Sequence, residues 1–278
     1  MTPHIPLRVS HLFHSLDTKL LELLKSLREE EWHAQTVAKH WKVKDVVAHL
    51  LDGNLRTLSI QRDGYFGETP ENIKSYQDLV AWLNQLNADW IKASKRLSPA
   101  VLMMLHELTG KSVSDYYCSL DPNVKAIFPV AWAGEEESQN WFHLAREYME
   151  KWLHQQQIRD AVNKPAILTS EYFVPFIDSA FRALPYTFKE VEATDGTCLH
   201  IQLDLPEKES WFLEHAQGNW VVSRQAPIKT DATLHIDANA AWKLFSKSWR
   251  PEEARPFTKI SGDRSLAEKA LHLVSFMA

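Results

Sequence analysis

Apolar residues in the first part of the chain recur at steps of three and four positions, which is the period of an amphipathic helix. The clearest stripe runs from Leu12 to Leu27, where leucines fall on one face. A second stripe begins at Val43, and a third follows Ser75. The pattern predicts helices over about residues 12–28, 43–58, 75–97, 98–108 and 135–162.

Several residues mark where these helices begin and end. Ser98 precedes Pro99, so that an N-cap residue is followed by the proline that suits a first turn. Gly110 is expected to end the same helix, and an irregular aromatic stretch follows at 111–134. The acids at 135–137 favour the positive end of a helix dipole. These signals predict a short fourth helix and a long fifth helix.

The period changes after about residue 183, where short segments rich in β-forming residues alternate with turns. Turn signals at Asp195-Gly196 and Gly218-Asn219 suit hairpins. The predicted strands span 186–191, 199–205, 210–216, 220–224 and 233–237, and helical runs follow at 238–247 and 265–277. The pattern predicts an all-α domain over 1–168 and an α+β domain, an antiparallel sheet with helices, over 169–278.

The length, the net charge and the placement of the glycines exclude some classes of partner and ligand. A chain of 278 residues suits two domains. Lys+Arg 31 against Asp+Glu 36 gives a formal net charge of −5, so no overall positive field exists to attract nucleic acid or an anionic membrane. The glycines form neither a GxGxxG nor a Walker-type phosphate loop. We therefore expect no nucleic-acid partner and no nucleotide site of those kinds.

The N-terminus and the cysteines bear on the cellular compartment. Residues 1–10 lack the apolar core of a signal peptide, and no stretch approaches the roughly 18 apolar residues of a membrane span. Cys118 and Cys198 are the only cysteines, which is too few for a disulfide scaffold of this size. Neither cysteine lies near a histidine motif, so both are interpreted as structural or incidental. We expect a cytoplasmic protein without a membrane association.

A carboxylate and an imidazole lie four positions apart in the fifth predicted helix. Glu150 and His154 are about 40° apart around the helix axis, one turn along the same face. Such a pair can share a divalent cation, although a solvated helix face shows the same spacing. The pair becomes informative only together with a further ligand.

His49 supplies that ligand from the second predicted helix. It lies among Val46, Val47 and Leu50, so we expect its ring to point into the helical interior. A buried histidine needs a hydrogen-bond partner or a metal. Three protein ligands with open positions are typical of a catalytic metal site rather than a closed structural one.

Three segments, in this order, resemble one protein family. Residues 41–50, with the pattern Trp-x-Val-x-Asp-Val-Val-x-His-Leu, resemble the helix-two motif of the mycothiol-dependent maleylpyruvate isomerase family, a branch of the DinB-like four-helix metalloproteins. Residues 146–161, with Arg, Glu and His at four-residue steps, resemble its second metal motif. Residues 260–267 resemble the end of the sterol-carrier-like domain that follows the bundle in these proteins. The resemblance covers nearly the whole chain.

The resemblance implies a DinB-like four-helix bundle and a sterol-carrier-like domain, with a divalent metal, usually zinc, held by His49, Glu150 and His154. It also implies a low-molecular-weight thiol cofactor, undecided between mycothiol, bacillithiol and glutathione. A bound cation stabilises a thiolate over a thiol. In the isomerase the thiolate is expected to add to an activated double bond, permit rotation and leave, so the thiol returns unchanged. No residue selects that substrate.

The neighbours of these ligands leave alternatives open. His143 and Glu147 continue the stripe of Glu150, so either could replace or supplement the chosen carboxylate. Glu150 is preferred because its spacing to the histidine matches the family motif. Asp45 and Asp160 could each orient a ligand imidazole, and a helix-cap or surface ion-pair role carries equal weight for both.

Residues outside the metal motifs complete the predicted site. Arg224, Arg250 and Arg264 are candidates for binding carboxylates of the thiol or substrate, in competition with ordinary solvated roles. Trp41 and Trp152 flank the ligands and could wall a pocket. We expect that pocket between the bundle and the second domain.

The leading hypothesis is a metal-dependent enzyme that acts with a small thiol on an electrophilic small molecule, as an isomerase or S-transferase. The alternative is a non-catalytic protein that binds a metal, or a small apolar ligand in the second domain. A DinB-type toxin-resistance or damage-response protein would share the metal site but not the substrate. The oligomeric state is not predicted.

Overall fold

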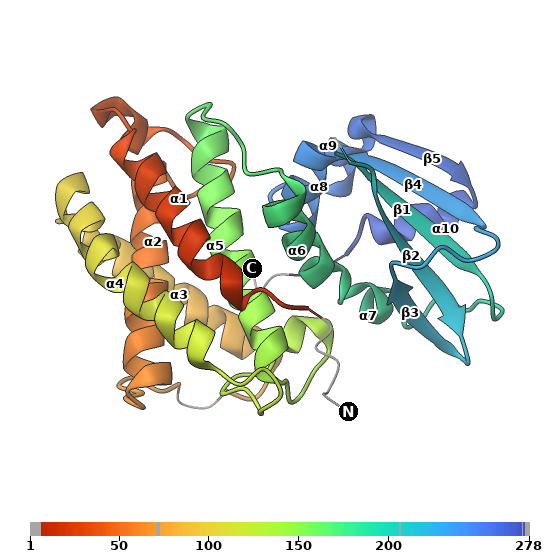
Figure 1. Cartoon of the computed structure of the whole chain (residues 1–278), viewed down its shortest axis with the longest axis horizontal. Coiled ribbons are helices and arrows are strands. Elements are labelled where there is room, and N and C mark those ends of the chain that lie inside the picture. The colour runs from red at the N-terminus through yellow and green to blue at the C-terminus, as the bar shows by residue number, and fades with distance from the viewer. Residues whose placement is uncertain (1–6, 71–72, 206, 274, 276–278) are drawn as a thin grey trace. The chain divides into compact units, whose positions relative to one another are not determined.

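A computed structural model of the chain describes residues 7–70, 73–205, 207–273 and 275 (Figure 1). The described residues divide into two compact units. The first contains residues up to 129 together with 137–166, and the second contains 130–136 together with the residues from 167 onward. A single boundary at residue 168, as predicted, would make each domain one continuous stretch of the chain. The second unit instead consists of two stretches, because it also includes the segment 130–136.

The first unit is helical. Its main elements are α1 (Phe13–Lys25), α2 (Val43–Arg56), the π-helical segment η3 (Thr57–Arg62), α3 (Tyr76–Ser94), α4 (Pro99–Ser119) and α5 (Asn140–Ala161). Helix α2 contacts α3, α4 and α5, and α1 contacts α4 and α5. Helix α2 is therefore the element around which the unit is organised.

The buried positions of α1 and α2 follow the leucine and valine stripes that predicted them. These side chains form one apolar cluster with Trp32, with Leu102 of α4 and with Ile158 of α5. The members from α1 and α2 are Leu20, Leu23, Leu24, Val43, Val46, Val47, Ala48, Leu50 and Leu51. Removal of this surface from water stabilises the helices, which would be marginal in isolation.

Helix α4 continues through Gly110 to Ser119, so the prediction that Gly110 ends a helix is wrong. A Cβ atom at Gly110 would lie 2.3 Å from Oδ2 and 2.6 Å from Cγ of Asp17 in α1. The glycine therefore lets α1 and α4 approach closely, which is a packing role inside the helix rather than a terminating one.

The prediction that this helix starts at the acids 135–137 is wrong, because helix α5 begins at Asn140. The backbone before it is paired with an earlier segment: Ala126 N donates to Ser138 O, and Asn140 N donates to Val124 O, both at 2.8 Å. This short antiparallel pairing uses the groups that an earlier helical turn would need. The helix therefore starts only where the pairing ends.

The second unit contains a mixed sheet. Its strands are β1 (Cys198–Asp204), β2 (Glu209–Ala216), β3 (Asn219–Ser223), β4 (Ala232–Asp237) and β5 (Thr258–Gly262), in the order β3-β2-β1-β4-β5. Neighbours pair antiparallel except β1 and β4, which are parallel, with Ile201 opposite Leu234. The antiparallel prediction is wrong at this pair. Strand β3 runs in the direction of β1, and residues 224–231 bring the chain back across the sheet before β4 starts.

Helices accompany the sheet. They are α6 (Ser170–Phe181), α7 (Leu184–Phe188), α8 (Ala238–Phe245), α9 (Pro251–Ala254) and α10 (Arg264–Ala270). Residues 186–191, predicted as a strand, instead contain the end of α7, where Pro185 in the first turn favours a helix. Helix α6 and strand β5 were not predicted. The helix predicted over 265–277 ends at Ala270, and Met277 lies outside the described residues.

Apolar side chains at alternate positions of the strands form one face of the sheet, and helices pack against the sheet. In β1 the side chains of Leu199, Ile201 and Leu203 are fully buried. Helix α8 contacts β1 and β4, and α10 contacts β4 and β5. Across the described ranges of both units, no helix has the length and apolar character needed to cross a membrane.

Candidate metal centre

Helices α2 and α5 bring His49, Glu150 and His154 together. Each residue offers one ligand atom, and these atoms lie within 4.8 Å of one another. Nε2 of His154 lies 3.3 Å from Oε2 of Glu150, one helical turn away. The rings of His49 and His154 meet edge to face, with their centroids 4.7 Å apart. The packing of α2 against α5 thus assembles a cluster of two imidazoles and one carboxylate.

The electrostatic state of His49 suits a ligand. Burial, helped by the charges of His154 and Arg56, holds the pKa of His49 well below its usual value, so its ring is neutral and keeps a lone pair. Its Nδ1 atom is buried and has no hydrogen-bond partner among the residues that the structure describes. An unpartnered buried polar atom is costly unless a ligand satisfies it.

Gln157 orients the second imidazole. Its Oε1 lies 2.9 Å from Nδ1 of His154, and both side chains are buried. Sequence reasoning missed this residue because a glutamine three positions after a histidine looks like part of a solvated face. The signal available was the run of glutamines at 155–157, which is polar yet buried in α5.

The donor set fits a divalent cation. Two nitrogens and one oxygen are ligands that zinc accepts, with a position left for a further ligand. Two metal bonds of about 2.0 to 2.2 Å span at most about 4.4 Å. The most widely separated ligand atoms therefore need to approach by only a few tenths of an ångström, which a small side-chain rotation provides.

Trp41 covers the cluster from one side. Its ring centroid lies 4.7 Å from that of His49 and 5.9 Å from that of His154. The loop that carries it is held by Gln35, whose Nε2 donates to the backbone oxygen of Trp41 at 3.0 Å. The predicted wall residue Trp152 is fully buried on α5.

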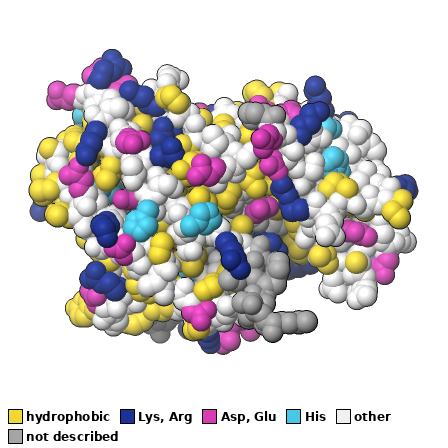
Figure 2. Space-filling model, viewed as in Figure 1, with side chains coloured by type: hydrophobic (Ala, Val, Ile, Leu, Met, Phe, Trp, Pro, Cys, Tyr) yellow, Lys and Arg dark blue, Asp and Glu magenta, His cyan; other side chains and the backbone are white. Residues whose placement is uncertain are grey.

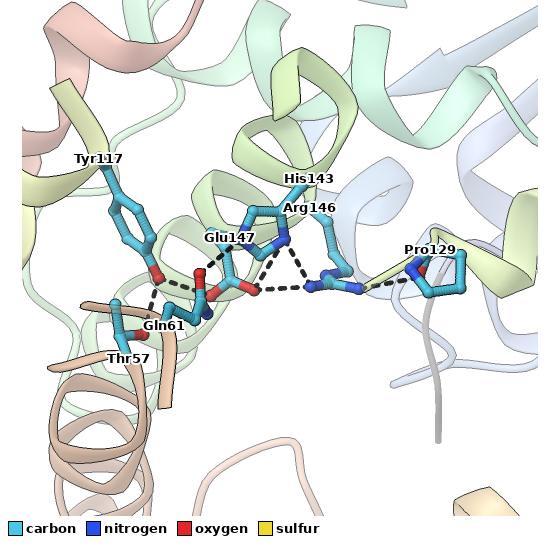
Figure 3. A network of polar contacts seen from close by, with 7 residues as sticks. All are labelled: Thr57, Gln61, Tyr117, Pro129, His143, Arg146 and Glu147. Carbon is cyan, nitrogen blue, oxygen red and sulfur yellow. Dashed lines mark hydrogen bonds and ion pairs between the residues drawn. The ribbon is translucent and has the colours of Figure 1, made fainter. Parts of the chain in front are cut away.

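The alternative ligands His143 and Glu147 belong to a different polar network (Figure 3). Arg146 donates through Nη2 to Nδ1 of His143 at 2.6 Å and to Oε1 of Glu147 at 3.0 Å. Nε2 of His143 then donates to Oε1 of Gln61 at 2.8 Å. Both ring nitrogens of His143 are therefore occupied by protein groups, and among the described residues only the cluster around His49 has metal-ligand geometry.

The same network holds Glu147 as a carboxylate. Burial raises its pKa, but the charges of Arg146 and His143, with hydrogen bonds from Tyr117 and Arg146, lower the pKa to about 2. Tyr117 donates to Oε2 of Glu147 at 2.9 Å and lies 2.9 Å from the hydroxyl of Thr57. Burial and the Glu147 charge raise the pKa of Tyr117 well above its usual value. The network ties α5 to α4 and to η3.

The two acids considered as orienting groups have different places. Oδ2 of Asp45 accepts a hydrogen bond from the backbone N of Lys42 at 3.0 Å, which is a capping contact at the start of α2. Asp160 lies in the last turn of α5. The position expected for an orienting group beside His154 is filled by Gln157.

The predicted arginines lie in the second unit, each in its own surroundings. Arg224 forms an ion pair with Glu209 and lies over the ring of Trp211, 4.1 Å from its centroid. Arg264 pairs with Glu268 at 2.9 Å. Arg250 is exposed and precedes α9. No contact described for these residues joins them into one anion-binding group.

Both cysteines are free. Cys198 is buried, and burial together with the charges of Glu214 and Asp231 raises its pKa to about 11. Cys118 is exposed, and burial of part of its surface together with Asp115 raises its pKa as well. A thiolate is disfavoured at both positions, which agrees with their interpretation as non-nucleophilic residues.

Comparisons with known proteins identify the family of the chain. Residues 13–159, more than half of the chain, match the family of the mycothiol maleylpyruvate isomerase N-terminal domain. Crystal structures of the mycothiol-dependent maleylpyruvate isomerase and of a histidine-to-alanine mutant resemble the chain in fold, with TM-scores of 0.55 and 0.54. Each is 12% identical, over 91% of this chain and 92% of the other. No curated protein matches the sequence. The chain belongs to the mycothiol maleylpyruvate isomerase N-terminal domain family.

Proposed function

We propose that the protein is a divalent-metal-dependent enzyme that uses a low-molecular-weight thiol, of the maleylpyruvate isomerase or thiol S-transferase type. The observation that carries the proposal is the convergence of His49, Glu150 and His154 within 4.8 Å. The family match and the names of the structural neighbours favour mycothiol as the thiol, ahead of bacillithiol and glutathione. An electrophilic small molecule is the expected substrate.

The chain's own residues prepare this site. His49, Glu150 and His154 would hold the cation, with zinc as the first candidate. When bound, the cation would favour the thiolate form of a thiol at neutral pH and so provide a nucleophile. Oε1 of Gln157 accepts a hydrogen bond from Nδ1–H of His154, which leaves the lone pair on Nε2 for ligation. Trp41 shields both imidazole rings from water on one side.

The second unit has a role in the same proposal. As a sterol-carrier-like domain, it would bind the polar parts of the thiol or substrate through Arg224, Arg250 or Arg264. Arg224 and Arg264 already have carboxylate partners, so an incoming carboxylate has to compete with Glu209 or Glu268. A reducing compartment such as the cytoplasm suits a free thiol cofactor and the two free cysteines.

The test uses the full chain. Metal content is measured by plasma mass spectrometry, and thermal unfolding is followed with mycothiol, bacillithiol or glutathione, with and without the metal. A cofactor that binds the native state raises stability by RT ln(1 + [L]/Kd), so one thiol should stand out, and only with metal present. Turnover of maleylpyruvate with that thiol is then followed by NMR. A chain that takes up no metal would contradict the proposal.

The non-catalytic alternative gives a different pattern in the same experiment. A metal-binding protein without turnover would be stabilised by the metal but by none of the thiols. A carrier of an apolar ligand would be stabilised by fatty acids or sterols irrespective of metal. These outcomes separate the three functions with one set of melting curves.

A further inference from the structure

A cavity of about 320 Å³ lies in the first unit, where the loop before α2 meets the end of α3. Its lining is mainly basic and includes Lys42, Lys44 and Lys95, with His33 and His40. None of these residues is a ligand of the candidate metal centre. The cavity is therefore a separate feature of the unit.

Two parts of the chain hold the lysines at this point. Lys42 is the N-cap residue of α2 and Lys44 lies in its first turn, whereas Lys95 caps the C-terminus of α3. Nζ of Lys44 donates to the backbone O of Lys95 at 3.2 Å, which fixes the two helix ends to each other. Lys42 and Lys44 come from one basic stretch of the sequence, residues 39–44, and tertiary packing adds Lys95 from a distant part of the chain.

The wall of the cavity is formed in advance of any ligand. The Nε2 atom of Gln35 lies 3.0 to 3.3 Å from the backbone oxygens of Thr36, Ala38, Lys39 and Trp41, so its two N–H groups are shared among them and order the loop. Asp45 is the one acid in the lining, and its Oδ2 accepts a hydrogen bond from the backbone N of Lys42. Its carboxylate thus serves the helix cap.

Among the residues that the structure describes, the cavity lysines have no carboxylate close enough to neutralise them. Some other lysines of the chain do have such partners, as in the pairs Lys25–Glu107 at 2.6 Å and Lys229–Asp231 at 2.8 Å. Acidic and basic side chains are interspersed over the face shown in Figure 2. No carboxylate in the described part of the chain pairs with the cavity lysines. Two of them lie at the positive end of the α2 dipole, where a cation is unfavourable.

We propose that this cavity binds a small anion with at least two negative charges, such as a phosphate ester or a dicarboxylate. Lysine ammonium groups act as point charges for either group, and an anion would offset both their mutual repulsion and the helix dipole. The volume suits a small molecule. Trp41 lies between the lining residues His40 and Lys42 and contacts both ligand histidines, so the anion site adjoins the loop that covers the metal centre.

Calorimetric titration of the full chain at low ionic strength tests the proposal, with inorganic phosphate, malonate and, as a monovalent control, acetate. We expect saturable one-to-one binding of phosphate, malonate or both, and no saturation by acetate. Lys42→Gln and Lys95→Gln should each weaken binding by about three- to tenfold. Lys39→Gln and Lys92→Gln, on the same loop and helix but outside the lining, should leave the affinity unchanged.

Melting temperatures provide a second measurement that is independent of calorimetry. Without anion, Lys42→Gln should melt no lower than the native chain because it relieves repulsion at the start of α2. Phosphate or malonate should raise the melting temperature of the native chain more than that of the variant. Absence of saturable binding by both dianions, or equal losses in the lining and control variants, would overturn the proposal. Preference for phosphate over malonate, or the reverse, identifies the ligand class.

Discussion

Gln157 and His154 are joined across one turn of α5, with Oε1 of the amide 2.9 Å from Nδ1 of the imidazole. An amide oxygen can only accept, so Nδ1 carries the proton and Nε2 keeps the lone pair that faces Glu150. The contact lies within a single helix. It therefore sets the tautomer of His154 without help from the rest of the fold.

Gln157→Leu removes the acceptor while keeping the side chain's size. We expect metal affinity to fall by about 10- to 100-fold, which is the usual effect of losing a group that orients a ligand histidine. Competition with a fluorescent chelator measures it. Gln157→Glu keeps an acceptor oxygen and should bind metal within a few-fold of the native chain. Native affinity in Gln157→Leu would show that the hydrogen bond has no part in ligation.

His49→Ala should abolish stoichiometric metal binding and leave the fold intact. The apolar cluster of α1 and α2 does not include His49, so the helical core persists without it. Metal content and far-ultraviolet circular dichroism provide the measurements. His11→Ala, an exposed position at the start of the described chain, is the control and should bind one equivalent. Full occupancy in His49→Ala would mean that another histidine is the ligand.

Glu150→Gln and Glu147→Gln should have opposite effects. The first removes a ligand oxygen, so metal affinity should drop by more than about tenfold with little change in stability. The second breaks the contacts with Arg146 and Tyr117, so the free energy of unfolding should fall by about 2 kcal/mol while metal affinity is retained. Urea unfolding and chelator competition on both variants distinguish them. Reversed results would make Glu147 the ligand.

Gly110→Ala should be destabilising although alanine favours helices. The new Cβ would meet the Asp17 carboxylate, and overpacking of this kind costs about 1 to 3 kcal/mol against a gain of about 0.5 to 1 kcal/mol in helix propensity. Gly53→Ala in α2 is the matched control, since its Cβ would have no neighbour within 4 Å, and it should be stabilising. Denaturation in urea measures both. The Asp17→Ala background should reduce the effect at Gly110, and an unchanged effect would point to another cause.

Stability should fall as the pH drops from 6.5 toward 4. Burial lowers the pKa of both His106 and His143 to about 4, whereas each titrates near 6.5 in an unfolded chain. Between these values only the unfolded state binds the proton, so acid favours unfolding, and above pH 6.5 the effect vanishes. Each histidine contributes about 2 kcal/mol to the loss of stability between pH 6.5 and 4.5.

Urea unfolding of metal-free protein at pH 7.5 and 4.5 measures this loss. The asparagine of His106→Asn does not titrate in this range. The free energy of unfolding should therefore change less between pH 7.5 and 4.5 in this variant than in the native chain, and the reduction should equal the contribution of one histidine. An identical difference in the variant and the native chain would show that His106 is not neutral in the folded state.

The sequence predicts that His49, Glu150 and His154 come together, because the signals for this convergence are local. The spacing of Glu150 and His154 sets their common face, and the apolar neighbours of His49 set its inward direction. The choice between Glu150 and Glu147 is not a local property, since both lie on one stripe of α5. It depends on the rotation of α5 against α2 and on Arg146 and its partners.

Three of the errors in the fold prediction have a common origin in contacts between residues that are distant in sequence or on different strands. Gly110 reads as a helix end because its packing partner, Asp17, is distant in sequence. Apolar and polar residues alternate along β4 as they do in an antiparallel strand, and the sequence of β4 does not indicate that its neighbour is β1. The helix predicted from residue 135 is displaced by backbone pairing between Ala126 and Ser138. In these three cases a contact outside the local sequence decides the structure.

The segment 130–136 lies within the sequence of the first unit but belongs to the second. Val130 and Trp132 are buried, and a Cβ at Gly134 would lie 2.8 Å from the ring of Tyr186. The chain therefore passes between the units at three points in its length. A single recombination event near residue 167 would separate this segment from the residues that bury it, so the units of two relatives could be exchanged intact only by crossovers at all three junctions.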